Sequence, residues 1–89
     1  MIKLIDVEPC GPSRLRLRFS DGTAGIYDFS RFVGAATVMT LPLGQPEFFG
    51  RYYIDAGSLA WPNGFDLSAT SLHRELRDRG ELRPDAGNG

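Results

Sequence analysis

The amino-acid sequence predicts a small α+β domain, with an antiparallel sheet of about four or five strands built from two hairpins and packed by a C-terminal helix and one or two short helices. Three observations support this prediction. One segment alternates strictly between charged and apolar residues, glycine-containing turns separate two pairs of strand-like segments, and a capped amphipathic stretch lies near the end of the chain. Of the 89 residues, 42% are hydrophobic and 24% are charged, which is typical of one folded domain.

The first hairpin begins the sheet. Residues 2–7 are predicted to form a strand that ends by Pro9, because proline cannot donate a ladder hydrogen bond. In residues 14–19 the apolar side chains share one face and the arginines share the other. Asp21–Gly22 suits a two-residue turn, and residues 24–29 then continue as a strand. Counting back from this turn opposes Leu17 to Ile26 and Arg16 to Tyr27, and it predicts a core face of Leu15, Leu17, Phe19 and Ile26.

The middle of the chain predicts shorter elements. One helical turn fits residues 31–33, and an irregular connection follows from Thr37 to Gly44, where proline and glycine interrupt the chain. Residues 45–49 resemble a short helix, with Pro46 near its first turn and Gly50 at its end. A second hairpin is expected from strands at residues 51–55 and 58–61 around Ala56–Gly57, followed by the turn Pro62-Asn63-Gly64.

The last predicted helix begins near Ser68, whose hydroxyl can cap the first free backbone amides. Leu72 and Leu76 lie one turn apart, so they are expected to pack against the sheet in a narrow apolar stripe. Gly80 is placed to end the helix.

Charge and cysteine content exclude several classes of protein. Ten Lys and Arg against eleven Asp and Glu give a net charge of −1, which removes a domain-wide attraction to nucleic acid or anionic membranes. Cys10 is the only cysteine and cannot form an internal disulfide, and no export signal or spanning segment is recognisable, so we expect a cytoplasmic protein. Residues 83–89 have almost nothing to bury, so we expect one domain over residues 1–82 and a disordered tail over residues 83–89.

The most specific motif lies between the second hairpin and the last helix. It reads Leu59-Ala60-Trp61-Pro62-Asn63-Gly64-Phe65-Asp66-Leu67-Ser68, and Phe19-Ser20-Asp21-Gly22-Thr23, Tyr27-Asp28 and Phe48-Phe49 accompany it. With these motifs the chain resembles, over roughly residues 2–77, the small bacterial family catalogued as domain of unknown function 2442. The resemblance implies an α+β domain of this size, gene neighbours from another short uncharacterised family in an arrangement like that of a toxin and its antitoxin, and no enzymatic activity. Some members of the family also carry a helix-turn-helix domain, for which the residues after the last predicted helix leave no room.

Catalytic and metal-ligating candidates are few. His73 is the only histidine, and it has no Glu or Cys at metal spacing beside it. Cys10 has no activating motif around it and is interpreted as inert. The chain has no phosphate-binding loop and no nucleophile elbow. We therefore expect a protein that is not an enzyme, with no catalytic residue, no cofactor and no metal.

Three aspartates keep one enzymatic alternative open. Asp28, Asp55 and Asp66 could form an acidic cluster like those of Mg²⁺ sites if the fold brought them together. A structural interpretation is favoured for Asp66, which can accept backbone N–H bonds in the turn after Asn63–Gly64. Trp61 is likewise expected to fill the core, because its large side chain supplies apolar area that a small domain needs.

Two surface features are candidates for binding. The first, the arginine stripe, can meet phosphates or an acidic partner, or it can be a solvated face that Asp6 and Glu8 balance while Arg16 stacks on Tyr27. The second, the aromatic segment, has more ring surface than one side of a short element can bury, so part of it is expected to contact a partner. The arginine stripe consists of Arg14, Arg16 and Arg18, and the aromatic segment consists of Phe48, Phe49, Tyr52 and Tyr53.

The expected function is that of a non-catalytic protein-interaction domain of a bacterial type. The family resemblance adds the role of the antitoxin-like member of a two-protein module. Such a domain would bind and occlude another small protein through the aromatic segment or an open strand edge. The alternative is a nucleic-acid-binding module that uses the arginine stripe, alone or as a dimer. Self-association therefore stays open as well, and a membrane partner is not expected.

Overall fold

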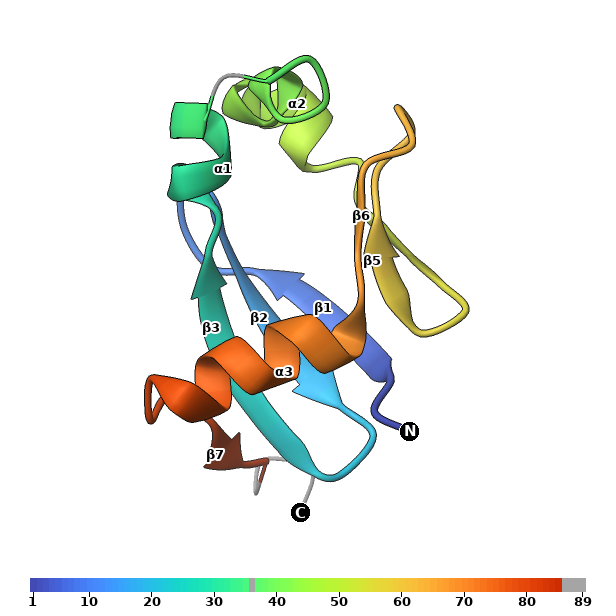
Figure 1. Ribbon diagram of the computed structural model, residues 1–89, viewed down its shortest axis with the longest axis vertical. Coiled ribbons are helices and arrows are strands. Elements are labelled where there is room, and N and C mark those ends of the chain that lie inside the picture. Colours follow the sequence, from blue (N-terminus) through green and yellow to red (C-terminus); the bar gives the residue numbers. More distant parts are fainter. Residues whose placement is uncertain (36, 86–89) are drawn as a thin grey trace.

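The computed structural model describes residues 1–35 and 37–85, which form two antiparallel sheets and a set of mostly short helices (Figure 1). The first sheet has the strand order β1-β2-β3-β7 and consists of β1 (Leu4–Pro9), β2 (Arg14–Phe19), β3 (Thr23–Asp28) and β7 (Arg83–Pro84). The second has the order β4-β5-β6 and consists of β4 (Tyr53–Asp55), β5 (Ser58–Ala60) and β6 (Asp66–Leu67). The helices are α1 (Ser30–Ala35), the 3₁₀ helix η1 (Leu41–Gly44), α2 (Pro46–Phe49) and α3 (Ala69–Asp78).

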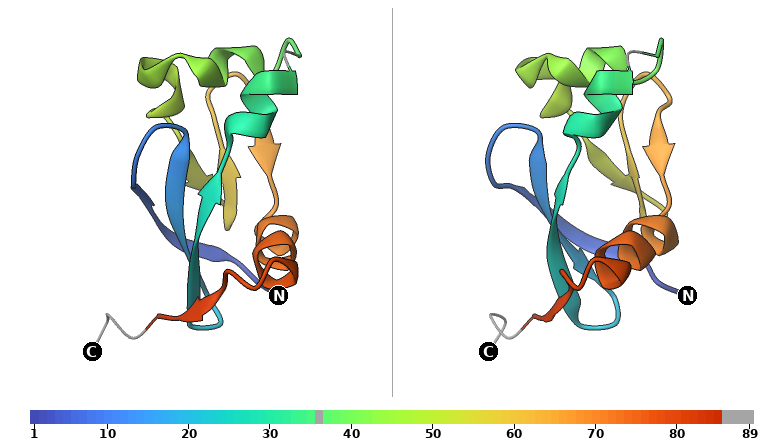
Figure 2. Two further views of the ribbon diagram at one scale, coloured as in Figure 1. Left: turned by 90° about the vertical axis from the view of Figure 1, so that its left-hand side faces the viewer. Right: turned by 60° about the vertical axis from the view of Figure 1, so that its left-hand side comes forward.

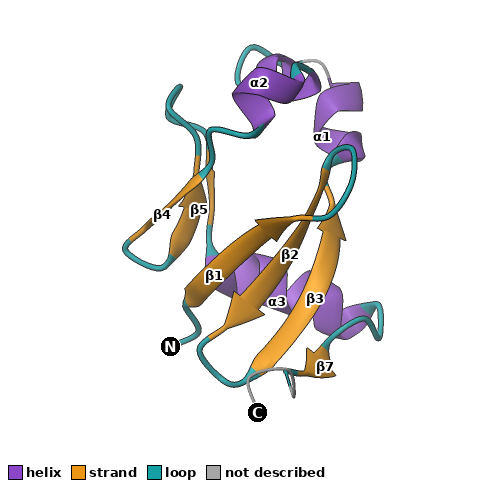
Figure 3. Cartoon of the chain, turned by 180° about the vertical axis from the view of Figure 1, so that it is seen from behind, coloured by secondary structure: helices purple, strands orange, loops and turns teal. Residues whose placement is uncertain are grey.

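The α+β prediction is confirmed, and the arrangement of its two hairpins is now defined. They belong to separate sheets rather than to one continuous sheet. Helix α3 covers one face of the first sheet, and Figure 3 shows the opposite face free of helices. The short helices α1, η1 and α2 gather at one end of the molecule, while β7 lies at the other (Figure 1).

The first hairpin has a different register from the one that the sequence predicts. Arg16 pairs with Ile26 and Leu15 pairs with Tyr27, because the loop is the three-residue segment Ser20–Gly22. Gly22 adopts φ +86° there and donates its N–H to the Phe19 carbonyl. A shift of one residue exchanges the two faces of a strand. The prediction of Ile26 in the core is therefore wrong: Ile26 is 51% exposed, and Tyr27 takes the buried position.

The second hairpin forms as predicted around Ala56–Gly57. Both residues have positive φ, +51° and +86°, as a two-residue turn matched to the twist of its strands requires. The Gly57 carbonyl also accepts a hydrogen bond from the Leu4 amide at 2.9 Å, which ties this turn to the start of β1. A Cβ at Gly57 would lie 2.8 Å from the Lys3 side chain, so the close approach of the two segments needs glycine here.

Helix α3 confirms the expected cap and packing stripe. The Ser68 hydroxyl accepts the N–H of Ser71, and Leu72 and Leu76 are buried against the sheet. Helix α3 and the turn after it lie so close to β3 that a Cβ on Gly25 would be 3.0 Å from the Leu76 side chain and 2.9 Å from the Glu81 carbonyl oxygen. Glycine at position 25 therefore sets the distance between the helix and the strand.

The core joins the two sheets through a group of aromatic rings. Trp61 is fully buried, as predicted, and its ring centroid lies 5.7 Å from that of Phe29 and 5.9 Å from that of Phe49. The indole N–H donates to the Phe49 carbonyl at 2.9 Å, so the polar atom of the buried ring is satisfied. The core cluster consists of Leu4, Leu15, Leu17, Phe19, Tyr27, Phe29, Leu43, Phe49, Leu59, Trp61, Ala69, Leu72 and Leu76.

The C-terminal segment is ordered further than the sequence predicts. The sequence predicts disorder from residue 83, but Arg83–Pro84 pairs with Ala24 and Thr23 as strand β7, and the Asp85 amide donates to the Gly22 carbonyl at 2.8 Å. Backbone pairing and ion pairs stabilise this segment, which explains why its lack of apolar residues misled the prediction. Residues 86–89 of the predicted tail lie outside the described residues.

No helix in the described part of the chain has the length and apolar character needed to cross a membrane.

Candidate interaction surfaces

The arginine stripe lies on the helix-free face of the first sheet and meets carboxylates from both neighbouring strands. Arg16 and Arg18 lie opposite Glu8 and Asp6 of β1, with ion-pair distances of 3.8 and 3.6 Å. Arg14 lies opposite Asp28 of β3, and this pair is 3.7 Å apart. Because Ile26 rather than Tyr27 lies opposite Arg16, the predicted stacking of Arg16 on Tyr27 does not occur.

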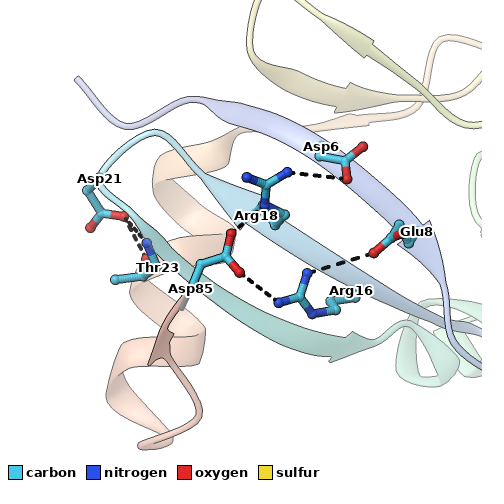
Figure 4. Close-up of polar contacts among 7 residues, drawn as sticks. All are labelled: Asp6, Glu8, Arg16, Arg18, Asp21, Thr23 and Asp85. Carbon is cyan, nitrogen blue, oxygen red and sulfur yellow. Dashed lines mark hydrogen bonds and ion pairs between the residues drawn. The ribbon is translucent and has the colours of Figure 1, made fainter. Parts of the chain in front are cut away.

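A fourth carboxylate reaches the stripe from the C-terminal segment, as Figure 4 shows. Asp85 accepts a hydrogen bond from Arg16 Nη2 at 3.1 Å through one oxygen and from Arg18 Nε at 2.5 Å through the other. Its side chain is only 7% exposed. The hydrogen bonds from Arg18 and Arg16 hold the pKa of the Asp85 carboxyl below its usual value, so the carboxylate stays charged at neutral pH.

The aromatic segment is divided between the core and the surface. Phe49, at the end of α2, is buried against Trp61 and Phe29, while Phe48 and Tyr52 are partly buried and pack against the core. Tyr53 belongs to β4 and is 48% exposed. Of the four predicted contact residues, Tyr53 and parts of Phe48 and Tyr52 are therefore accessible.

An apolar groove lies beside the aromatic segment. It has a volume of about 330 Å³, and it runs between the β1–β2 loop and the η1–α2 segment, two parts that approach each other in Figure 2. Burial raises the pKa of the Tyr52 phenol at its edge, and the negative charges of Asp6 and Glu8 add to that effect. The groove thus has a largely apolar lining, and the two carboxylates near its edge are paired with Arg16 and Arg18. Its lining includes Pro9, Pro12, Leu15, Leu43, Pro46 and Tyr52.

The motif residues after β5 form a turn whose polar roles differ from those predicted. The Asn63 side chain accepts the N–H of Phe65 at 3.1 Å and donates to the Met39 carbonyl at 3.0 Å, and Gly64 has φ +92°. Asn63 therefore does what the sequence predicted for Asp66. Asp66 instead pairs through its backbone with Ala60 in the second sheet, and its side chain makes no hydrogen bond to the described residues.

The residues considered for catalysis or metal binding do not form a shared site. His73 Nε2 lies 2.9 Å from an Asp21 oxygen, and the His73 ring packs edge-on against Phe19, so it links α3 to the β2–β3 turn. Asp28 caps the start of α1 by accepting the Ser30 N–H. Within the described ranges, no group of three or more His, Cys, Asp or Glu side chains is arranged to hold a metal ion.

One polar cluster was missed by sequence reasoning. The buried Tyr27 donates its hydroxyl to Glu75 of α3, and Arg31 of α1 donates to both the Tyr27 oxygen and Glu75 at 3.0 Å. Burial, followed by the hydrogen bond to Glu75, raises the pKa of Tyr27 to about 12. The available signal was that Glu75 lies three residues after Leu72, which places a charge on the packing side of the helix.

Comparisons with known proteins agree with the resemblance seen in the sequence. The family model described as "Protein of unknown function (DUF2442)" matches residues 4–78. Neither the curated proteins nor the solved structures gave a match. The matched range runs from the first residue of β1 to the last residue of α3, so it takes in both hairpins, the short helices and the Trp61 turn. The chain therefore belongs to the DUF2442 family.

Proposed function

We propose that this chain is a non-catalytic protein-interaction domain that binds a segment of another small protein in the apolar groove. The observation that carries the proposal is the groove itself. It is an open apolar concavity in a domain of 89 residues, and proline, leucine and aromatic side chains form its lining. Apolar concavities with polar margins are the usual sites at which domains capture a partner's side chains.

The lining of the groove indicates the chemistry of the partner. Asp6 and Glu8, whose negative charges influence the Tyr52 phenol, are themselves ion-paired with Arg18 and Arg16 and do not line the groove. A partner segment with apolar side chains would be complementary to the apolar lining. The proposed partner segment is therefore an apolar one.

More specifically, we propose that the domain is the antitoxin-like member of a two-protein module, a role that the family resemblance supports. In that role the domain would cover a functional surface of the partner protein. The nucleic-acid alternative would rely on the arginine stripe, where three arginines meet four carboxylates from Asp6, Glu8, Asp28 and Asp85. Local neutralisation of this kind favours the groove over the stripe as the binding surface.

Two neighbouring tyrosines provide a matched test. The full chain, Tyr52→Ala and Tyr53→Ala would each be used to capture proteins from a nuclease-treated bacterial lysate, and the affinity for the captured small protein would then be measured after purification. Tyr52 lines the groove and Tyr53 does not. We expect Tyr52→Ala to weaken binding by about ten-fold or more, and Tyr53→Ala to leave it within about two-fold.

Equal affinity of the two variants would contradict the groove as the binding site. Recovery that disappears with nuclease and falls steeply with salt would favour the nucleic-acid alternative. Phe49 is unsuited to this test, because it is a core residue and its replacement would disturb the fold.

A further inference from the structure

The C-terminal segment adds a short strand, β7, to the first sheet. After α3 the chain turns at Gly80, with φ +70°, and the Glu81 amide donates to the Leu76 carbonyl at 2.8 Å. Residues 83–85, which we call the strap, then run antiparallel to β3: Arg83 and Pro84 pair with Ala24 and Thr23, and the Asp85 amide donates to the neighbouring Gly22 carbonyl. This short pairing is the geometry by which protein domains accept extended peptides at a sheet edge.

A specific side-chain contact accompanies the backbone pairing. The carboxylate of Asp85 spans Arg16 and Arg18, one oxygen to each guanidinium, and is almost completely covered (Figure 4). Two arginines that donate hydrogen bonds to one carboxylate bind an acidic residue strongly and in a defined orientation. The sheet edge and the arginine pair thus act together on one extended acidic segment.

Most of the β3 edge stays open beyond the strap. In the described part of the chain, the backbone of residues 25–28 makes no hydrogen bond other than those of the β2 and β7 ladders. A hollow of about 500 Å³ lies beside this edge, and Ile26 is exposed within it. Two of its arginines are ion-paired, Arg14 with Asp28 and Arg79 with Glu75 of α3, so the charged contact for a partner comes from Arg16 and Arg18 rather than from the hollow. Its lining consists of Arg14, Ile26, Asp28, Arg79, Glu81 and Arg83.

We propose that the outer edge of β3 and the arginine pair Arg16–Arg18 form a recognition site for an extended acidic segment of a partner protein, and that residues 83–85 occupy this site in the same chain when no partner is bound. The partner segment would pair with the backbone of β3 and place an Asp or Glu side chain between the two guanidinium groups, where Asp85 now lies. In this site β7 lies at the opposite end of the molecule from α2 (Figure 1), and the residues that line the hollow differ from those that line the apolar groove, so the site goes beyond the function proposed above.

The strap makes binding competitive. A partner carboxylate can pair with Arg16 and Arg18 only after the Asp85 carboxylate has moved away. The apparent affinity of the full chain for a partner is therefore the intrinsic affinity multiplied by the fraction of molecules in which the strap is open. Weakening the strap without changing Arg16 or Arg18 should increase the affinity for an acidic peptide. This reciprocal behaviour separates the proposal from a merely structural role for the C-terminal segment.

The test uses a peptide with the sequence of residues 81–89 as the probe, together with a second peptide that carries the Asp85→Asn change. Isotope-labelled full chain and its Asp85→Asn variant would be titrated with each peptide and followed by NMR. We expect the variant to bind the aspartate peptide about ten-fold more tightly than the unchanged chain does, with the largest shifts at Gly22, Thr23 and Ala24. The asparagine peptide should bind the variant about ten-fold more weakly than the aspartate peptide.

Two further variants keep the test decisive. Pro84→Gly loosens the strap through chain entropy and leaves every charge in place, so it should raise the affinity in the same direction by a smaller factor and replaces Asp85→Asn if that variant misfolds. Arg18→Gln added to either variant should abolish the gain. Tyr52→Ala should leave peptide binding unchanged, so a failure here is distinguishable from a failure of the groove.

Three results would overturn the proposal. They are equal affinities of the variant and the unchanged chain, no binding by either, and shifts located away from the β3 edge. A separate partner protein would be overturned by a dimer of the unchanged chain that is detected by sedimentation and lost in Asp85→Asn, because that dimer would place the strap of one copy, with its Asp85 carboxylate, in the site of the other.

Discussion

The arginine stripe and the aromatic segment are both local concentrations of similar side chains in the sequence, but the two differ in where the fold places these side chains. On the sheet face, three arginines remain at the surface but meet carboxylates, one of which, Asp85, lies 69 residues from Arg16. In the aromatic segment, neighbouring rings are divided, so that Phe49 is buried and Tyr53 is exposed. Carboxylates from other segments thus neutralise the arginine stripe. In the aromatic segment, the direction of each side chain decides whether its ring is buried or exposed.

The largest expected effect is on the buried side of the aromatic segment. Phe49→Ala removes a ring that packs on both Trp61 and Phe29, so it should lower the free energy of unfolding by about 3–5 kcal/mol. Urea denaturation followed by circular dichroism would measure the loss. Tyr53→Ala is the control and should change stability by less than about 0.5 kcal/mol. Similar losses for the two variants would remove the contrast between buried and exposed rings.

The next effect concerns the contact of β3 with α3 and the turn that follows it. Gly25→Ala would put a methyl group 2.9 Å from the Glu81 carbonyl oxygen and 3.0 Å from Leu76, so we expect destabilisation of about 1–3 kcal/mol. Gly34→Ala is the matched control, because nothing lies within 4 Å of the added methyl group in helix α1. Alanine is the better helix former, so the control should be neutral or more stable by up to about 1 kcal/mol. An unaffected Gly25→Ala variant would show that the helix end moves freely.

A pH titration tests the neutralised arginine face. The pKa of Asp85 is lowered in the folded chain by Arg18 and Arg16, so its contribution to stability is present above the unfolded pKa and is lost as pH falls through the folded one. The unchanged chain should be more stable than Asp85→Asn near neutral pH, and the difference should shrink below about pH 4. Urea unfolding of both proteins across that range measures it. A difference that is independent of pH would argue against a charged Asp85.

The smallest effect is expected at the exposed end of the stripe. Arg14 and Asp28 form an ion pair at 3.7 Å with both side chains about half exposed, and such pairs contribute little because water screens them. Arg14→Gln should therefore change the unfolding free energy by less than about 0.5 kcal/mol. Thermal unfolding at low and high salt would check this, and a large salt-dependent loss would show that the stripe acts as one coupled network.

Local patterns predicted much of this molecule, and long-range pairing accounts for the rest. The alternation in residues 14–19 and the Ser68 cap were enough to predict β2 and α3, because both signals lie within one element. The register of the first hairpin was missed because Asp-Gly fits both two-residue and three-residue loops, and the choice between them decides whether Ile26 or Tyr27 faces the core.

The surfaces show the same limit. The density of rings in the aromatic segment indicated an interaction surface, but only the fold shows which rings line a groove. The neutralisation of Arg18 by Asp85 was out of reach, because Asp85 lies in a segment with no periodicity and a composition typical of disorder. Backbone pairing at two residues and the ion pairs of one carboxylate stabilise that segment. A hydrophobic pattern in the sequence cannot predict either kind of interaction.

The buried indole of Trp61 gives this chain an optical reporter of its own. Trp61 is the single tryptophan, it is shielded from water, and its N–H is held by the carbonyl of Phe49, a residue that also lines the apolar groove. When light that tyrosine does not absorb excites the chain, the emission therefore comes from Trp61 alone and should shift to longer wavelength when this site is opened to water. A ligand that enters the groove and moves α2 would change the same signal, so occupancy of the groove can be followed without a dye.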